Sequence, residues 1–353
     1  MADNTVANAQ KKQTALTPAE RATLFNKLTR RYLNNVETRT GGDNTTVNFK
    51  LPKTRLLAGC ILEVTGTLKA THATETAFTA DVDAPYSYIA NITMSYNSAF
   101  SPFNISGRAI KDYNQTVRGV DTVSRLSVLP KVASSAGTSN AFKFFVELPN
   151  MLNDRDPVSL ILLQSDETVV DINVTFGSKN DIAPAASGFT FETSGVQIAL
   201  LTDTFSIPAD ANAFPDISVL KLVQERNYTV SDGDNTHVLS TGRTYRKLGL
   251  QFTDSNGAAM SNADIGNIQL VFNQATTAYN ISPDMLQMMN TRAYGGALGT
   301  GRFVFDFSDN GQPNFGGARD YIDTLSLTEF WLRFNAEKAG TVKVWSECLV
   351  RLS

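Results

Sequence analysis

The chain has 353 residues, of which 42% are hydrophobic and 18% charged, and its formal net charge is −3. This length suits two domains rather than one, and the weakly negative balance excludes a general electrostatic surface for nucleic acid. Cys60 and Cys348 both lie in strand-like runs, so we expect buried thiols rather than a secreted disulfide framework. The polar N-terminus has no apolar signal region, and the longest apolar run, at residues 160–163, is too short to span a bilayer.

Residues 1–16 are small and polar without a hydrophobic period, so we expect a flexible N-terminal arm. An amphipathic helix is predicted at residues 17–36, because Thr17 suits the N-cap, Pro18 suits the first helical position and Glu20 completes a capping box. Its apolar side chains recur every three to four residues on one face, which must dock on the rest of the chain: Phe25, Leu28, Tyr32 and Val36.

Positive charge is concentrated at this end of the chain. Residues 1–36 hold six basic and two acidic side chains, a net charge of +4, so the remainder carries −7. The basic side chains of the predicted helix lie opposite its apolar face: Arg21, Lys27, Arg30 and Arg31. This basic face either meets an anionic surface or is an ordinary solvated helix face, and the sequence leaves both interpretations open.

A first β-rich half is predicted at residues 37–177, followed by a linker at 178–188 that is rich in Gly, Ala, Ser and Pro. Alternating apolar residues predict strands near 47–51, 61–68, 88–96, 103–110, 141–148, 158–164 and 168–176. Residues 113–123 are mixed and fit either a short helix or a long loop.

A second β-rich half is predicted at residues 189–353. Its strand-like runs are 197–201, 219–230, 244–253, 267–273, 302–307, 325–334 and 341–352, and Ser282 with Pro283 starts a short helix at 282–290. The two halves end on similar series of runs, 144–148, 159–163 and 169–174 in the first and 303–307, 327–334 and 342–347 in the second. We interpret the chain as a duplicated β-sandwich.

The residue types needed for catalysis are scarce. The two histidines, His72 and His237, lie in polar stretches without the partners of a triad or a zinc site. The glycine-rich run at residues 295–302 lacks the Gly-Lys-Ser/Thr ending of a phosphate-binding loop and precedes a strand. We therefore predict no enzyme, no catalytic residue, no cofactor and no metal site, although two carboxylates could still converge from distant strands.

Several segments, taken in order, match a known family. Leu16-Thr17-Pro18-Ala19 opens the helix, Val36-Glu37-Thr38-Arg39-Thr40 leaves it, and the block at residues 59–69 runs into His72-Ala73-Thr74-Glu75. Residues 144–176 then read as strand, Pro-containing polar loop, strand, turn and strand. In these segments the chain resembles the double jelly-roll major capsid proteins of tailless bacteriophages with an internal membrane, the tectivirus family.

The resemblance implies an all-β fold of two side-by-side eight-stranded jelly rolls with an N-terminal amphipathic helix. It implies a structural virion protein, made in the host cytoplasm without a signal peptide, whose homotrimers are pseudo-hexagonal capsomers of an icosahedral shell. The implied partners are further copies of itself, the internal membrane, and minor capsid and vertex proteins, with no direct contact to nucleic acid.

The resemblance also gives the N-terminal helix two roles. One face would meet lipid headgroups or acidic neighbours in the lattice, and it comprises Arg21, Lys27, Arg30 and Arg31. The other face would pack on the base of the sandwich, and it comprises Phe25, Leu28 and Tyr32.

A function of another class also fits the composition. A receptor- or carbohydrate-binding β-sandwich, such as a spike or a glycosidase, would need a groove with clustered acids or exposed aromatic residues. The long loop from Ser308 to Ile322 is the best place for such a groove.

Overall fold

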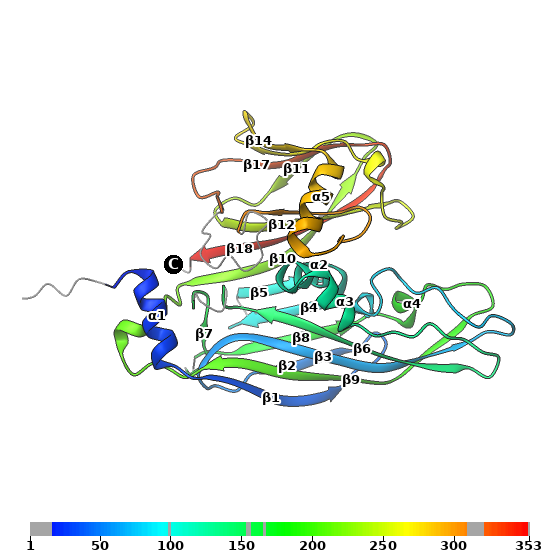
Figure 1. Cartoon of the computed structure of the whole chain (residues 1–353), viewed down its shortest axis with the longest axis horizontal. Coiled ribbons are helices and arrows are strands. Elements are labelled where there is room, and N and C mark those ends of the chain that lie inside the picture. Colours follow the sequence, from blue (N-terminus) through cyan, green and yellow to red (C-terminus); the bar gives the residue numbers. More distant parts are fainter. Residues whose placement is uncertain (1–15, 98–99, 153–156, 165–166, 309–320, 352–353) are drawn as a thin grey trace, which may run out of the picture.

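The computed structural model describes residues 16–97, 100–152, 157–164, 167–308 and 321–351. Strands make up 49% of the structure and helices 17%, so the all-β prediction is confirmed. Figure 1 shows two β-sandwiches stacked on each other, with the N-terminal helix α1 (Pro18–Leu28) at one end of the lower sandwich. The predicted arm at residues 1–16 lies outside the described residues except for Leu16, and so do residues 309–320 of the predicted binding loop.

The first sandwich is built from two sheets. One sheet has the strand order β1-β9-β3-β6 and the other the order β5-β4-β8-β2, while the short β7 (Ile161–Leu162) pairs with β3. The long strands are β1 (Arg31–Thr40), β2 (Thr46–Lys50), β3 (Leu56–Thr71), β4 (Ile89–Tyr96), β5 (Phe100–Ile105), β6 (Thr138–Pro149), β8 (Val170–Phe176) and β9 (Thr190–Phe205).

The second sandwich repeats this plan. Its sheets have the orders β10-β18-β12-β15 and β11-β17-β13-β14, while the short β16 (Ile322–Asp323) pairs with β12. The long strands are β10 (Val219–Val230), β11 (Gly233–Leu239), β12 (Thr244–Asp254), β13 (Ile268–Phe272), β14 (Thr276–Ile281), β15 (Arg302–Asp306), β17 (Phe330–Ala336) and β18 (Gly340–Arg351).

The two strand orders are the same when the long strands are counted along the chain. β1 takes the place of β10, β3 that of β12, β6 that of β15 and β9 that of β18, and the facing sheets agree in the same way. Eight strands in two such sheets form a jelly roll. The chain therefore consists of two jelly rolls of one topology, which confirms the predicted fold.

The sandwiches are joined edge to edge as well as packed. β5 of the first pairs in parallel with β10 of the second, through Phe103 opposite Val223 and Asn104 opposite Gln224. Four strands from each sandwich thereby form one continuous sheet, to which β16 is attached as a ninth strand. The position of one sandwich against the other is thus fixed partly by backbone hydrogen bonds.

Side chains alternate along the strands as sandwich packing requires. In β3, Leu62, Val64 and Leu68 are buried in the interior, while Glu63 and Thr65 point outward. Each sandwich has its own hydrophobic core, and the core of the first extends across the junction to Trp345 in β18. The two sandwiches are therefore packed together as well as paired.

The helices occupy the connections between strands. α2 (Gly107–Arg118) and α3 (Val120–Arg125) fill the mixed region, which settles the choice between helix and loop in favour of helix. α5 (Pro283–Tyr294) begins after its Ser282 N-cap as predicted and runs four residues beyond the expected end. The remaining short helices are α4 (Lys179–Ile182), η1 (Tyr86–Tyr88), η2 (Ala211–Ala213) and η3 (Asn262–Asp264).

Two predicted boundaries need correction. The N-terminal helix ends at Leu28 rather than near residue 36, because residues 31–40 pair with β9 as strand β1, and sheet pairing overrides local helical periodicity. The second jelly roll does not begin at residue 189, because β9 lies between β1 and β3 in the first sandwich. The chain crosses to the second sandwich within residues 206–218, and residues 178–188 connect β8 to β9.

The second error has a simple origin. The sequence comparison of the two halves matched residues 169–174 with 342–347, whereas the topology places β8 with β17 and β9 with β18. That match gives β9 no counterpart in the first half, which is why the sequence places it in the second.

Candidate functional site

Among the described residues, charged side chains with a candidate role gather at helix α1 and at the junction between the sandwiches. Helix α1 starts with the predicted capping box. The backbone N–H of Glu20 donates to Oγ1 of Thr17 at 3.3 Å, and the backbone N–H of Thr17 donates to Oε2 of Glu20 at 2.8 Å. The two bonds satisfy donors that a helix start leaves without partners.

One aromatic side chain anchors α1. Phe25 is fully buried and its ring centre lies 5.3 Å from that of Phe205 in β9. The other buried members of this small cluster, which is separate from the two sandwich cores, are Leu56, Ala58, Met151 and Leu160. Among the three predicted docking residues, Phe25 is the one that packs as a core side chain.

The other two docking residues are placed differently. Leu28 is 47% exposed at the last turn of the helix. Tyr32 lies in β1 and is half-buried, with the Arg55 guanidinium 3.6 Å from its ring centre, a cation–π contact.

The four basic residues do not share one helix face. Lys27 and Arg30 are exposed, Arg30 just beyond the end of α1. Arg21 is half-buried within electrostatic reach of Asp216. Arg31 lies in β1 and its Nε donates to Oδ1 of Asp203 at 2.9 Å. The basic surface at this end of the molecule therefore rests on fewer side chains than the sequence suggested, chiefly Lys27 and Arg30.

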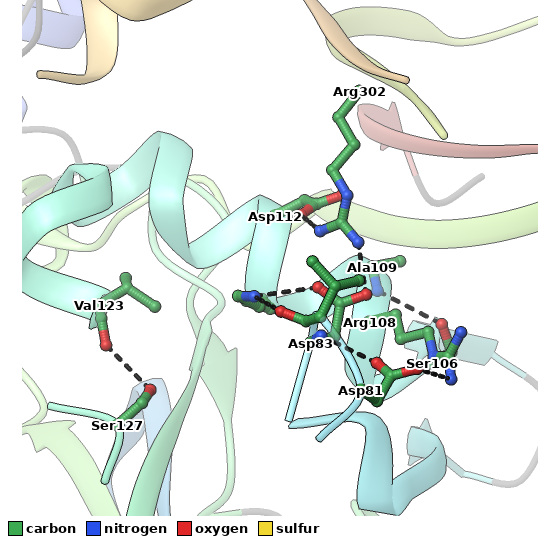
Figure 2. Close-up of polar contacts among 11 residues, drawn as sticks. Asp81, Asp83, Ser106, Arg108, Ala109, Asp112, Val123, Ser127 and Arg302 are labelled. Carbon is green, nitrogen blue, oxygen red and sulfur yellow. Dashed lines mark hydrogen bonds and ion pairs between the residues drawn. The ribbon is translucent and has the colours of Figure 1, made fainter. Parts of the chain in front are cut away.

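A buried ion-pair network spans the junction (Figure 2). Arg302, at the start of β15, reaches from the second sandwich to Asp83 and Asp112 of the first and donates to both carboxylates. Lys111 adds a second cation, with its Nζ 3.0 Å from Oδ1 of Asp83. Arg302 and the two carboxylates that it meets are at most 5% exposed. Their mutual pairing is what makes burial of these charges tolerable.

A second buried network lies beside the first. The hydroxyl of Tyr113 in α2 donates to Oε2 of Glu347 in β18 at 2.7 Å, and Nε of Arg246 donates to Oε1 at 2.8 Å. The Tyr113 ring also meets Trp345 edge to face, at 5.7 Å between ring centres. Lys247 of β12 donates to the backbone carbonyl of Thr116 in α2 at 3.2 Å. Helix α2 thus belongs to the first sandwich and packs on the second.

The networks shift the acidity of their members. Burial raises the pKa of Asp112 to about 6. Burial also disfavours ionised Glu347, but nearby cations, chiefly Lys221 and Arg246, outweigh it and lower the pKa of Glu347 to about 2. Burial lowers the pKa of Lys221 to about 8. Asp112 with Arg302 and Tyr113 with Glu347 bond across the junction, and all four side chains are closed to solvent, so they hold the sandwiches together rather than contact a substrate.

Other chemistry-bearing residues have structural surroundings. Both cysteines are buried free thiols, and burial raises the pKa of each. The His72 ring contacts that of Phe189 in a tilted arrangement, at 4.3 Å between ring centres, and the half-buried His237 has its pKa lowered by burial. The described part of the chain holds no cluster of three or more metal-ligating side chains. Nor does a helix in that part combine the length and hydrophobicity needed to cross a membrane.

The junction networks are not predictable from the sequence. Their partners lie 190 residues apart for Arg302 and Asp112 and 234 apart for Tyr113 and Glu347, so no spacing rule connects them. The only available signal was a charged residue inside an otherwise apolar strand, such as Lys247 or Glu347.

Comparison with known proteins agrees with this architecture. The family described as viral coat protein P2 N-terminal domain matches residues 225–346, which lie within the second jelly roll. The sequence matches no curated protein.

Among solved structures, the chain is similar to the major capsid protein of Sulfolobus turreted icosahedral virus, with a TM-score of 0.69 and 15% identity over 91% of this chain and 97% of that chain. The capsid of virus PBCV-1 gives a TM-score of 0.63 and 9% identity over 91% and 95% of the two chains. Protein P2 of bacteriophage PM2 gives 0.55 and 11% over 92% and 98%. At these identities the likeness concerns the fold, and the chain has the double jelly-roll fold that these capsid proteins share.

Proposed function

We propose that this chain is a major capsid protein and acts by self-assembly. The observation that carries the proposal is the pair of jelly rolls with one strand order, joined edge to edge and packed through a buried charge network. The likeness to capsid proteins extends over at least nine-tenths of both chains in three solved structures, which supports the same role. We expect no enzymatic activity, since the described charged clusters are closed to solvent.

The form of assembly that we propose is a homotrimer with a pseudo-hexagonal outline. A duplicated domain in a threefold ring gives six similar edges, and such a block tiles a flat facet of an icosahedral shell. The protein would then be a component of the virion, in contact with neighbouring capsomers and with minor capsid and vertex proteins.

The N-terminal end is the part that we propose faces an internal membrane, as the resemblance to the tectivirus family implies. Lys27 in the last turn of α1 and Arg30 just beyond the helix are exposed, and Leu28 is the exposed apolar side chain between them in sequence. Exposed basic side chains near a membrane surface attract anionic lipid headgroups.

The native mass of the purified full chain, with negative-stain images of the same sample, tests the proposal. We expect about three times the chain mass of 38.4 kDa and particles with a hexagonal outline. A folded monomer at micromolar concentration, with no hexagonal particles, would refute the proposal.

A further inference from the structure

The repeat between the two jelly rolls extends to their helices. α2 and α5 each have 12 residues, each begins after a serine N-cap, Ser106 or Ser282, and each follows the fifth strand of its sandwich. Eight residues after the cap, both carry a buried asparagine. Asn290 bonds the backbone N–H and C=O of Val304 in β15 at 2.8 and 2.7 Å. Asn114, with its amide turned to suit, bonds the same two groups of Glu147 in β6 at 3.0 Å each.

The strand register repeats as closely. β3 and β9 have a bulge between Leu57 and Gly59, and β12 and β18 have one between Tyr245 and Lys247. Beyond the bulge, Gly59 pairs with Asp203 as Lys247 pairs with Glu347. The bulge and the asparagine bonds give the same alignment independently, so each residue at the junction has an equivalent in the other sandwich.

Within the chain, the junction is asymmetric. The first sandwich contributes its fifth strand, β5, and helix α2. The second sandwich receives them on the edge of β10 and on the outer face of β12, β15 and β18. The corresponding contributing parts of the second sandwich are β14 and α5, and the corresponding receiving parts of the first are β1, β3, β6 and β9.

These equivalent parts lack a partner sandwich in the single chain. Among the described residues, β14 pairs only with β13 and β1 only with β9, and Figure 1 shows β14 and β1 on opposite sides of the molecule. Leu33 of β1 is 61% exposed, whereas its equivalent Val223 is fully buried opposite β5. On α5, Met288 and Met289 are 52% and 48% exposed, and they match Asp112 and Tyr113, which face the second sandwich.

We propose that β14 and α5 of one copy dock on the first sandwich of a second copy, repeating between chains the junction made within the chain. β14 then adds to the β1 edge in parallel, with Tyr279 and Asn280 opposite Leu33 and Asn34 of the second copy. The proposal rests on the proposed self-assembly and assigns its interface.

The side chains of α5 and of the receiving face on the first sandwich are complementary, but through apolar contacts rather than the ion pairs of the internal junction. Inside the chain, Asp112 meets Arg302 and Tyr113 meets Trp345. On the receiving face of the first sandwich, the equivalents of Arg302 and Trp345 are the half-buried Phe145 and Leu201. Met288 and Met289 therefore face an aromatic and an aliphatic side chain, and methionine packs well on both.

This difference also gives the contact its specificity. Docking α2 against Phe145 and Leu201 would leave Asp112 without its bonded cation, Arg302, so the polar junction stays within the chain and the apolar one forms between chains. A contact that joins unlike surfaces repeats from copy to copy, and it closes as a ring where the rotation allows. Three chains supply the six sandwiches of the proposed capsomer.

Disulfide trapping tests the proposed strand pairing in the full chain. Neighbouring strands lie about 5 Å apart, which suits a disulfide between facing residues, so the double variant Asn34→Cys and Asn280→Cys should form covalent trimers under mild oxidation. The native thiols are buried and give little background. The control pair is Asn34→Cys with Val238→Cys. Val238 is exposed on β11, at the opposite edge of the sheet that contains β14, so this pair should form no crosslink.

A second variant tests the helix contact. Met288→Glu with Met289→Glu should lower the trimer fraction at least tenfold, whereas Val238→Glu, also exposed, should leave it unchanged. If the wild type is a trimer but the cysteine variant does not crosslink and the glutamate variant keeps its trimer fraction, this interface is overturned while the proposed function stands. A wild-type monomer would instead refute the proposed function itself.

Discussion

Replacement of Arg302 by methionine removes the cation that both Asp83 and Asp112 share. The methionine fills a similar volume, so the main change is electrostatic. The two carboxylates are at most 3% exposed, and Lys111 remains in direct contact with Asp83 while it acts on Asp112 only through longer-range attraction. Loss of one partner from a buried ion pair costs about 3–5 kcal/mol, because it leaves an uncompensated buried charge.

The size of the effect should depend on the second carboxylate. Burial already raises the pKa of Asp112 to about 6 with Arg302 present. Without Arg302, we expect the pKa of Asp112 to rise above 7, so that its carboxyl group is neutral at that pH. Protonation then limits the penalty to about 1.4 kcal/mol for each pH unit between the unfolded-state pKa of about 3.9 and pH 7. Adding Asp112→Asn to Arg302→Met should therefore recover part of the lost stability.

Urea unfolding of the full chain at one protein concentration measures these differences, since assembly makes stability concentration-dependent. Arg226→Met is the control: this arginine is exposed on β10, and its replacement should change the free energy of unfolding by less than about 0.5 kcal/mol. The reasoning would be refuted if Arg302→Met unfolded with the wild type, or if Asp112→Asn deepened the loss.

Three further perturbations test other parts of the structure. Phe25→Ala should destabilise the docking of α1 by about 3–5 kcal/mol and speed tryptic cleavage after Lys27. Leu28→Ser, at an exposed position, should do neither. Equal cleavage rates of the two variants would contradict the role of Phe25 as the anchor of α1. Glu347, with its pKa lowered to about 2, contributes about 3 kcal/mol above pH 4.5 that is lost as pH falls toward 2. Glu347→Gln should therefore reduce the pH dependence of the unfolding free energy in that range. An unchanged dependence would argue against this role of Glu347. Replacing Arg21, Lys27 and Arg30 by Gln should weaken binding to anionic vesicles and leave the trimer intact. Unaltered binding would contradict the proposed contact with a membrane.

Much of the strand pattern followed from the sequence, because sandwich strands with one face buried alternate with period two. The predicted runs at residues 47–51, 219–230 and 244–253 coincide closely with β2, β10 and β12. The start of α1 and the start of α5 followed from their N-caps, since capping is a contact between residues only three positions apart.

The tertiary structure decided what depends on distant pairing. Residues 31–36 fit a helical period, yet β9 captures them as a strand. The place of β9 in the first sandwich, and with it the true crossing point, follows from its position between β1 and β3 rather than from its composition. The buried networks at Arg302 and Glu347 join residues about 200 positions apart, and the outward methionines of α5 differ from core methionines only by what covers them. Local patterns thus determined which segments form strands and helices, whereas long-range pairing and burial decided which sandwich each strand joins and which charges and apolar side chains lie at the junction.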